Sequence, residues 1–307
     1  METSHRLRLA VHCSLLAACC FPFAILAPSI AAQDSFTMRN GRIVEGRLTR
    51  VTEDKVFIEI SLEKEGSKGG TSIPISEIAK ARLKPPDAIE IARAFLAQEN
   101  GKGAVQILEP MVREHLPLIA TTETWVADAV LLLSEALLQS GNARRSSELA
   151  ATVVQRGWNS DLKGRAQMVK LRACMAGNHF SDAEAEAERI LAESQDVAAK
   201  AEAGFYRAKA RAMVGKKEEA LEDFMRMAVL RPQLKPWASA SLLEAARLEF
   251  GRGDLKHAAA LIHELLAEES LDPSLAKEVS ALIKEWKLPP FKPEIIPEKL
   301  DFTGTTR

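Results

Sequence analysis

A small residue recurs at nearly constant intervals along most of this 307-residue chain. Alignment on the position that follows each turn places Ser146, Ala183, Ala220 and Ala258 at spacings of 37, 37 and 38 residues. A more divergent copy places Ala104 42 residues before Ser146. A period of this length is typical of a supersecondary unit that buries its apolar face only by stacking on its neighbours. The spacing therefore predicts an array of similar units in place of a single globular core.

Each unit reads as a pair of helices. Apolar residues recur at i, i+3, i+4 and i+7, and glycines mark the short turns. We expect five pairs over residues 85–270, followed by a terminal helix in LDPSLAKEVSALIKEWKLPP that covers the last apolar face. The first small position is taken by Ala92, Ser134, Leu171, Ala208 and Ala246, and a bulkier position by Met111, Val153, Ile190, Met227 and Leu265.

The copy at 201–234 reads AEAGFYRAKARAMVGKKEEALEDFMRMAVLRPQL and resembles the tetratricopeptide repeat (TPR) family. Ala208 and Ala220 let the paired helices approach, Phe224 fills the gap, Gly215 turns the chain and Pro232 ends the second helix. The family's Trp and Tyr are mostly missing, and the period is three to four residues longer than the 34 of the family. The resemblance implies a TPR-like αα-solenoid over 85–290, with another kind of αα-solenoid as the alternative.

Residues 34–84 have a different texture, rich in Val, Ile and Thr. Asn40-Gly41 is a strong hairpin signal, the runs RIVEGRLTRV and KVFIEIS alternate as half-buried strands do, and Gly46 suggests a bend or bulge. Four to five short strands in this span predict a small β-barrel of the SH3-like or Sm-like kind, which Pro85-Pro86 ends.

The first 32 residues read as a signal peptide. Arg6 and Arg8 precede the apolar run LAVHCSLLAACCFPFAILA, and PSIAAQD offers small residues for cleavage after Ala31 or Ala32. A membrane-anchoring helix is one alternative. Another is a bacterial lipoprotein, because LAAC fits a lipidation box at Cys19. We expect an exported protein of the periplasm or cell envelope, with membrane attachment only if Cys19 is lipidated, and an extended or disordered tail at 291–307.

Composition and motifs give no chemistry for an enzyme. Net charge is -1, which predicts no nucleic-acid partner, and Cys174 is the one cysteine beyond the signal peptide. GKKEEA lacks the upstream glycine and the Ser/Thr of a phosphate loop, and HELLA lacks the second histidine of a zinc protease. We expect no catalytic, cofactor or metal residues, and we interpret Arg252-Gly253-Asp254 as a repeat turn with Asp254 as helix cap.

In the TPR family the first helix of each pair lines a concave groove, so the resemblance implies where a partner binds. Transfer of the fifth, ninth and twelfth positions of these helices predicts an apolar floor with a row of cations, which Glu135 interrupts. Such a groove suits a peptide with hydrophobic anchors and acidic groups; the alternative is that these residues serve only packing and solvation. The predicted partner-binding residues are Arg93, Leu131, Met168, Arg172, Phe205, Lys209, Leu243, Arg247 and Phe250.

The sequence therefore predicts an exported scaffold or adaptor that binds a protein or peptide partner, with cell-envelope assembly as its setting by analogy with TPR proteins. The alternative is a structural envelope protein whose copies self-associate as a homo-oligomer and take no peptide ligand.

Overall fold

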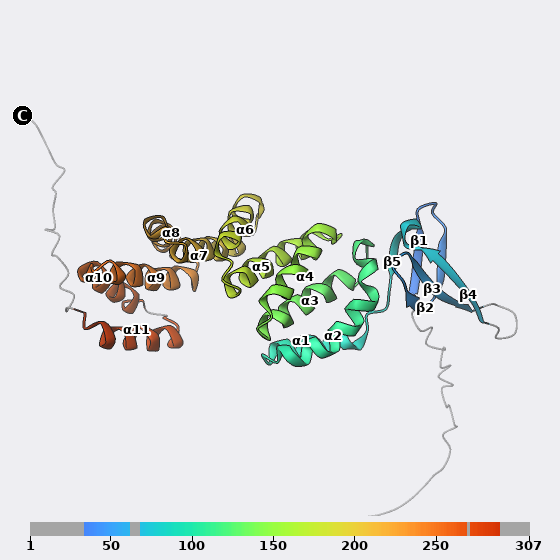
Figure 1. Ribbon diagram of the computed structural model, residues 1–307, viewed down its shortest axis with the longest axis horizontal. Coiled ribbons are helices and arrows are strands. Elements are labelled where there is room, and N and C mark those ends of the chain that lie inside the picture. Colours follow the sequence, from blue (N-terminus) through green and yellow to red (C-terminus); the bar gives the residue numbers. More distant parts are fainter. Residues whose placement is uncertain (1–33, 62–67, 269–270, 289–307) are drawn as a thin grey trace, which may run out of the picture. The chain divides into compact units, whose positions relative to one another are not determined.

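The computed structural model describes residues 34–61, 68–268 and 271–288, which form a small antiparallel sheet followed by helices (Figure 1). The predicted signal peptide, Cys19 and the tail at 291–307 lie outside the described residues. No helix in the described ranges has the length and apolar character needed to cross a membrane.

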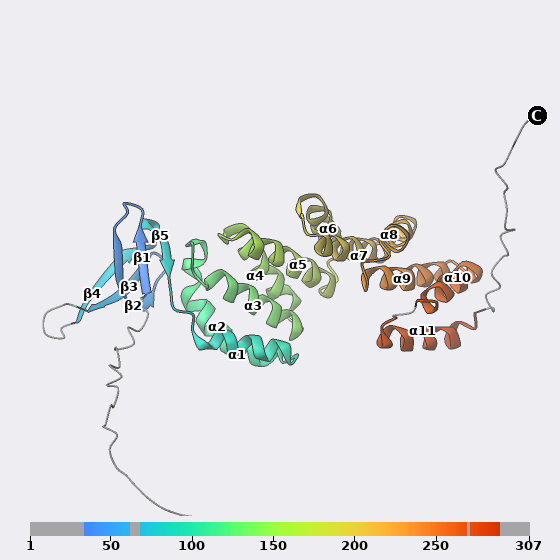
Figure 2. The same ribbon diagram turned by 180° about the vertical axis from the view of Figure 1, so that it is seen from behind.

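The sheet contains five strands in the order β4-β3-β2-β1-β5, each antiparallel to its neighbours (Figure 2). A short 3-10 helix, η1, links the two edge strands. A β segment before the helices is confirmed, whereas its SH3-like or Sm-like identity and its division from the helical domain stay predictions. The strands are β1 (Asp34–Met38), β2 (Ile43–Val51), β3 (Lys55–Ser61), β4 (Lys68–Pro74) and β5 (Ile78–Arg82), with η1 at Ile75–Glu77.

Two positions of the sheet require glycine, each for a different physical reason. Gly41 has a φ of 85° in the turn between β1 and β2, so the predicted Asn40-Gly41 hairpin is confirmed. Gly46 lies where β2 meets β3, and a Cβ there would approach Ile58 Cγ2 to 2.5 Å. The register shift of β2 comes later, between Leu48 and Arg50. Gly46 is therefore a close-approach residue, and the bulge is its neighbour in the strand.

The remainder is helical, and the described chain contains the five predicted pairs plus the predicted terminal helix, in a TPR-like αα-solenoid. Each helix contacts the next along the chain from α1 to α10. The pairs are α1 (Asp87–Ala97) with α2 (Gly101–His115), α3 (Val126–Gln139) with α4 (Ala143–Arg156), α5 (Ser160–Ala176) with α6 (Phe180–Glu193), α7 (Val197–Met213) with α8 (Lys217–Leu230), and α9 (Trp237–Gly251) with α10 (Leu255–Leu266); α11 spans Pro273–Trp286.

One turn closes all five pairs. The residue before the N-cap of the second helix has a positive φ, and the N–H of the N-cap donates to the carbonyl five residues earlier, as in a Schellman motif. Only three of these positive-φ residues are glycines, so a search of the sequence for glycines identifies only three of the five turns. The five residues are Glu99, Gly141, Asn178, Gly215 and Gly253.

The residues that define the period are fully buried, which explains why they recur. In each pair, one lies on the first helix and one on the second, where the helices approach most closely. Ser134 and Ser146 occupy these places in α3 and α4, and each hydroxyl donates to the other residue's carbonyl, at 2.7 and 2.8 Å. The other buried pairs are Ala92 with Ala104, Leu171 with Ala183, Ala208 with Ala220, and Ala246 with Ala258.

The longer first interval also has a structural reason. After α2 the chain forms a second 3-10 helix, η2 (Leu116–Ala120), and then a segment that contacts β5. Ala81 N–H donates to Thr122 O at 3.0 Å, and Glu123 pairs with both Lys80 (3.0 Å) and Arg82 (2.7 Å). The added residues therefore tie the sheet to the first two helix pairs, and one buried core runs from β1 to α5.

Candidate functional site

The first helices of successive pairs lie side by side, since α1 contacts α3, α3 contacts α5, α5 contacts α7 and α7 contacts α9. These five helices form what we call the first-helix face. The predicted partner-binding residues all belong to it, so the helical period does gather them on one series of neighbouring helices.

The apolar members of the set are mostly buried in the solenoid. Leu131, Met168, Phe205 and Leu243 are each at most 8% exposed, and they belong to the hydrophobic cores of their repeats. Phe250 is partly exposed and stacks on Trp286 of α11, with ring centroids 4.3 Å apart. These side chains therefore pack neighbouring helices together, and their contact with a partner stays a prediction.

Each predicted cation pairs with a carboxylate of the helix that follows it in this series. Arg93 of α1 pairs with Asp128 of α3, and Arg172 of α5 donates to Glu202 of α7, with Nη2 2.8 Å from Oε2. Lys209 lies 3.4 Å from Glu244 of α9. Arg247 pairs with Glu278 of α11, which continues the series beyond the fifth pair. The row of cations is thus one half of an inter-repeat ion-pair ladder.

Glu135, which interrupts the row of cations, belongs to the same ladder with the charges exchanged. Its carboxylate lies 3.4 Å from Arg165 of α5. Three of the ladder's partners, Asp128, Arg165 and Glu202, occupy the second position of the repeat, counted so that the buried apolar residues Leu131, Met168 and Phe205 are at the fifth. The sequence signal was available in these three copies, because the charge at the second position is opposite to the charge at the ninth position of the preceding copy.

Arg172 shows how this arrangement affects one group. The hydrogen bonds from its guanidinium to Glu202 raise the pKa of Arg172, and burial acts in the opposite direction. Burial, and secondly the charge of Glu202, raise the pKa of Tyr206 nearby. Arg172 and Tyr206 therefore both hold their protons more firmly than usual.

A second polar feature lies inside the α5/α6 and α7/α8 pairs. Lys170 Nζ lies 2.8 Å from Glu186, and Arg207 makes two hydrogen bonds to Asp223, at 3.0 and 2.7 Å. The matching positions are Leu133 and Leu149 in α3/α4, and Ala245 and Leu261 in α9/α10. The middle two pairs thus have ionic contacts where the flanking pairs have apolar ones.

Arg211 extends the ionic contacts of α7/α8 towards α6. It pairs with Asp223 at 2.9 Å and with Glu184 at 2.9 Å, and Lys216 also reaches Glu184 at 2.9 Å. Burial raises the pKa of Glu184, but the hydrogen bonds from Lys216 and Arg211 together outweigh it and leave the pKa below its usual value. Glu184 is therefore a carboxylate held ionised by this network.

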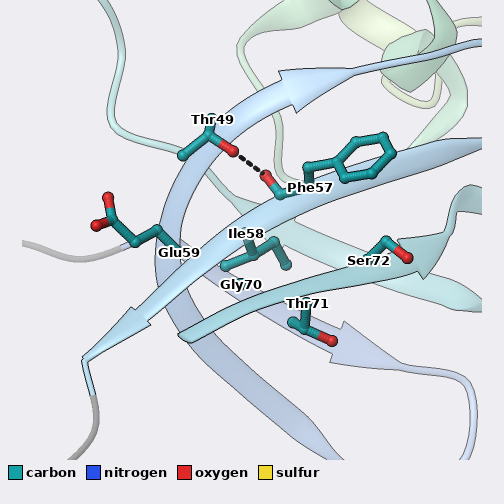
Figure 3. Close-up of a pocket in the computed structure, with 7 residues that line it drawn as sticks. All are labelled: Thr49, Phe57, Ile58, Glu59, Gly70, Thr71 and Ser72. Carbon is teal, nitrogen blue, oxygen red and sulfur yellow. Dashed lines mark hydrogen bonds between the residues drawn. The ribbon is translucent and has the colours of Figure 1, made fainter. Parts of the chain in front are cut away.

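The sheet carries an open hollow of about 400 Å³ across β2, β3 and β4. Figure 3 shows the Thr49 hydroxyl directed at the main-chain carbonyl of Phe57, to which it donates at 3.0 Å. The hollow is lined by Thr49, Phe57, Ile58, Glu59, Gly70, Thr71 and Ser72.

In the described ranges, neither a metal-binding cluster nor a reactive cysteine forms a further candidate site. These residues contain no group of three or more His, Cys, Asp or Glu side chains able to hold a metal ion. Cys174 is buried, and that burial raises the pKa of its thiol, so the reactive thiolate is disfavoured. Asp254 caps α10 by accepting from His257 N–H at 3.0 Å, which confirms the interpretation of Arg252-Gly253-Asp254 as a turn.

Comparison with known proteins gives structural neighbours only. No family model matches the sequence, and no curated protein matches it. A Podosopora anserina kinesin light chain with nearly identical TPR-like repeats is 20% identical, with 59% of this chain and 92% of that chain covered and a TM-score of 0.49. MamA from Desulfovibrio magneticus RS-1 is 16% identical, with 63% and 97% covered and a TM-score of 0.46.

A thermophilic TPR protein of Thermus thermophilus is 15% identical, with 64% of this chain and 98% of that chain covered and a TM-score of 0.47. All three scores lie below 0.5, so the TPR-like assignment depends on the chain's own five turns, buried small residues and helix pairs.

Proposed function

We propose that this protein is a scaffold that binds a protein partner through the first-helix face. The observation that carries the proposal is the side-by-side contact of α1, α3, α5, α7 and α9, which makes one continuous surface from five repeats. Helix-in-groove and extended-peptide recognition both use such surfaces, with apolar anchors for affinity and charges for orientation.

The charge pattern narrows the partner's chemistry. Because the cations of the face are paired with carboxylates, a partner meets alternating charges along the helices. A partner with charges of both signs at matching intervals fits this ladder better than a uniformly acidic peptide does. Partly exposed Phe250, Met175 and Leu138 supply apolar contacts on the same helices.

The test is partner capture from intact cells by crosslinking and mass spectrometry, with charge variants of the face. Reversal at Arg172, Lys209 and Arg247 is expected to reduce capture at unchanged helicity. A matched control is Arg144→Glu on α4, whose side chain is 86% exposed on a second helix. Equal capture by the reversed protein, the control and the native protein sinks the proposal.

Self-association is the competing outcome. Light scattering over a wide range of concentration distinguishes the two functions, because a scaffold for another protein keeps its mass at all concentrations. A mass that rises with concentration, and that the charge reversal abolishes, assigns the face to contacts between copies of this chain.

We propose further that the protein is exported to the cell envelope, which the basic, apolar and small-residue order of residues 1–32 supports. Mass spectrometry of the mature protein is expected to find an N-terminus at residue 32 or 33. Labelling with a palmitate analogue tests Cys19: no label on the mature protein ends the lipoprotein alternative.

A further inference from the structure

A cavity of about 230 Å³ opens between α7, α8 and the end of α6, away from the ion-pair ladder. Four of its eight lining residues are cationic and one is anionic, and the remainder are apolar or glycine. The lining consists of Leu191, Lys200, Gly204, Arg207, Asp223, Arg226, Met227 and Arg231.

Gly204 forms part of the cavity wall, on α7. The matching residue is Val130 in α3 and Leu242 in α9, and both of these side chains are buried in their helix pairs. A Cβ on Gly204 would lie only 3.3 Å from the Met227 methyl, so the Met227 side chain packs closely on the bare backbone at Gly204.

The charges of the cavity are only partly satisfied. Asp223 is engaged by Arg207 and Arg211, and Arg226 pairs with Glu222 on its own helix. In the described part of the chain, the side chains of Lys200 and Arg231 have no hydrogen-bond or ion-pair partner. An anion between Lys200 and Arg231 would therefore meet two free cations, with Arg226 as a third donor.

The other half of the cavity is apolar. Leu191, Met227 and the bare backbone at Gly204 offer hydrocarbon contacts next to the cations. Val197 and Leu230 lie one helical turn away from Lys200 and Met227, and are 54% and 67% exposed. The volume is below the roughly 300–1,000 Å³ of sites for drug-sized ligands, so it suits a short group.

We propose that this cavity binds a carboxylate carried on a short aliphatic stem. The carboxylate lies between Lys200 and Arg231 with Arg226 as a further donor, and the stem lies on Leu191, Met227 and Gly204. A free aliphatic acid and a glutamate side chain of a partner protein share this chemistry. Three of the lining residues lie on α7, but none of them belongs to the ion-pair ladder or to the predicted partner-binding residues, so either proposal can fail without the other.

The test uses the full-length mature protein with isotope-labelled methionine methyl groups, and follows the Met227 methyl signal by NMR. The probes are 4-methylpentanoate, its uncharged amide, and inorganic phosphate. We expect the acid to shift the Met227 signal with saturation. The amide should bind at least about tenfold more weakly because it has no charge to pair with the cations, and phosphate should bind at least about tenfold more weakly because it has no aliphatic stem to lie on Leu191 and Met227.

Two variants separate the halves of the site. Lys200→Gln with Arg231→Gln removes unpaired cations, so the fold is expected to be intact and acid binding to fall at least about tenfold. Gly204→Leu fills the apolar half and is expected to abolish binding. Arg156→Gln, an exposed cation at the end of α4, is the matched control and is expected to bind as the native protein does.

A second arm distinguishes the sources of the carboxylate. The peptide acetyl-Leu-Glu-Leu-amide is compared with its Glu→Gln counterpart and with the free acid. Tighter binding of the Glu peptide than of the free acid assigns the site to a partner protein, and the reverse order assigns it to a small acid. Equal binding of acid and amide, equal binding of phosphate and acid, or native affinity in the Lys200/Arg231 variant would overturn the proposal.

Discussion

The α3/α4 and α7/α8 pairs are built on the same repeat positions with opposite chemistry. In α3/α4, Leu133 and Leu149 face the pair interface and the small residues are hydrogen-bonded serines. In α7/α8, the same places hold the Arg207–Asp223 ion pair and two alanines. One backbone period therefore tolerates either apolar or ionic contacts between its helices, provided that each polar group finds its partner.

The largest expected effect comes from removing one member of the ionic pair. Asp223→Leu leaves Arg207 largely buried without its carboxylate, and we expect it to lower the free energy of unfolding by about 3 kcal/mol. Arg207→Leu with Asp223→Leu reproduces the α3/α4 chemistry and is expected to cost much less, because Arg211, the other partner of Asp223, keeps its ion pair with Glu184. Urea unfolding measures both, and equal losses in the single and double variants contradict the comparison.

The converse change in α3/α4 is expected to be smaller. Ser146→Ala removes the hydrogen bond from its hydroxyl to Ser134 O and the contact between the two hydroxyls, so the free energy of unfolding should fall by about 1 kcal/mol. Ser134→Ala with Ser146→Ala reproduces Ala208 and Ala220 and is expected to cost about 2 kcal/mol, because the hydrogen bond from the Ser134 hydroxyl to the carbonyl of residue 146 is lost as well. The same unfolding curves report both variants. A double variant as stable as the native protein would show that the two hydroxyls do no more than satisfy each other.

Acid is expected to separate the two regions. The folded pKa of Glu184 lies below its usual value of 4.5, so its contribution to stability is present above pH 4.5 and is lost as pH falls through the lower folded pKa. The interface of Leu133 and Leu149 has no titratable group at the matching places. Hydrogen exchange as a function of pH should therefore show α6–α8 losing protection before α3/α4. Glu184→Gln is the control: it should lose protection already at neutral pH and flatten the acid dependence.

The ion-pair ladder is expected to contribute least per rung, because its pairs are partly exposed. Arg172→Glu places a second carboxylate opposite Glu202 and should lower the free energy of unfolding by about 1 kcal/mol. Adding Glu202→Arg in the same chain should restore most of that stability. Added salt should reduce the difference between the single and double variants. A double variant as unstable as the single one means that packing of the Arg172 stem, and not its charge, carries the effect.

Much of the fold was readable because the repeat signal is spread over many residues. The pair boundaries, the terminal helix, the Asn40-Gly41 hairpin and the cap at Asp254 follow from turn chemistry and spacing. Glu99 and Asn178 adopt the same positive-φ turn without glycine, so that signal underreports the repeat. The pairing of β5 with the Thr122 segment connects residues far apart in the sequence, and no local pattern indicates it.

The candidate site was harder to predict from the sequence than the fold, for a physical reason. When each copy is considered alone, the apolar and cationic residues of the first helices predict a groove. Their partners, such as Glu202 for Arg172, lie 30 residues away in the next copy. The cavity at Gly204 is lined by residues of α6, α7 and α8, which no single stretch of the sequence brings together.

The most direct test of the scaffold function is site-specific photo-crosslinking in living cells. A photoreactive residue at Met175 reports from the first-helix face, and one at Arg144 reports from the exposed side of α4. We predict discrete adducts to one other protein from position 175 and none from position 144. Adducts of equal yield at both positions, or adducts to this chain alone, would contradict the scaffold function.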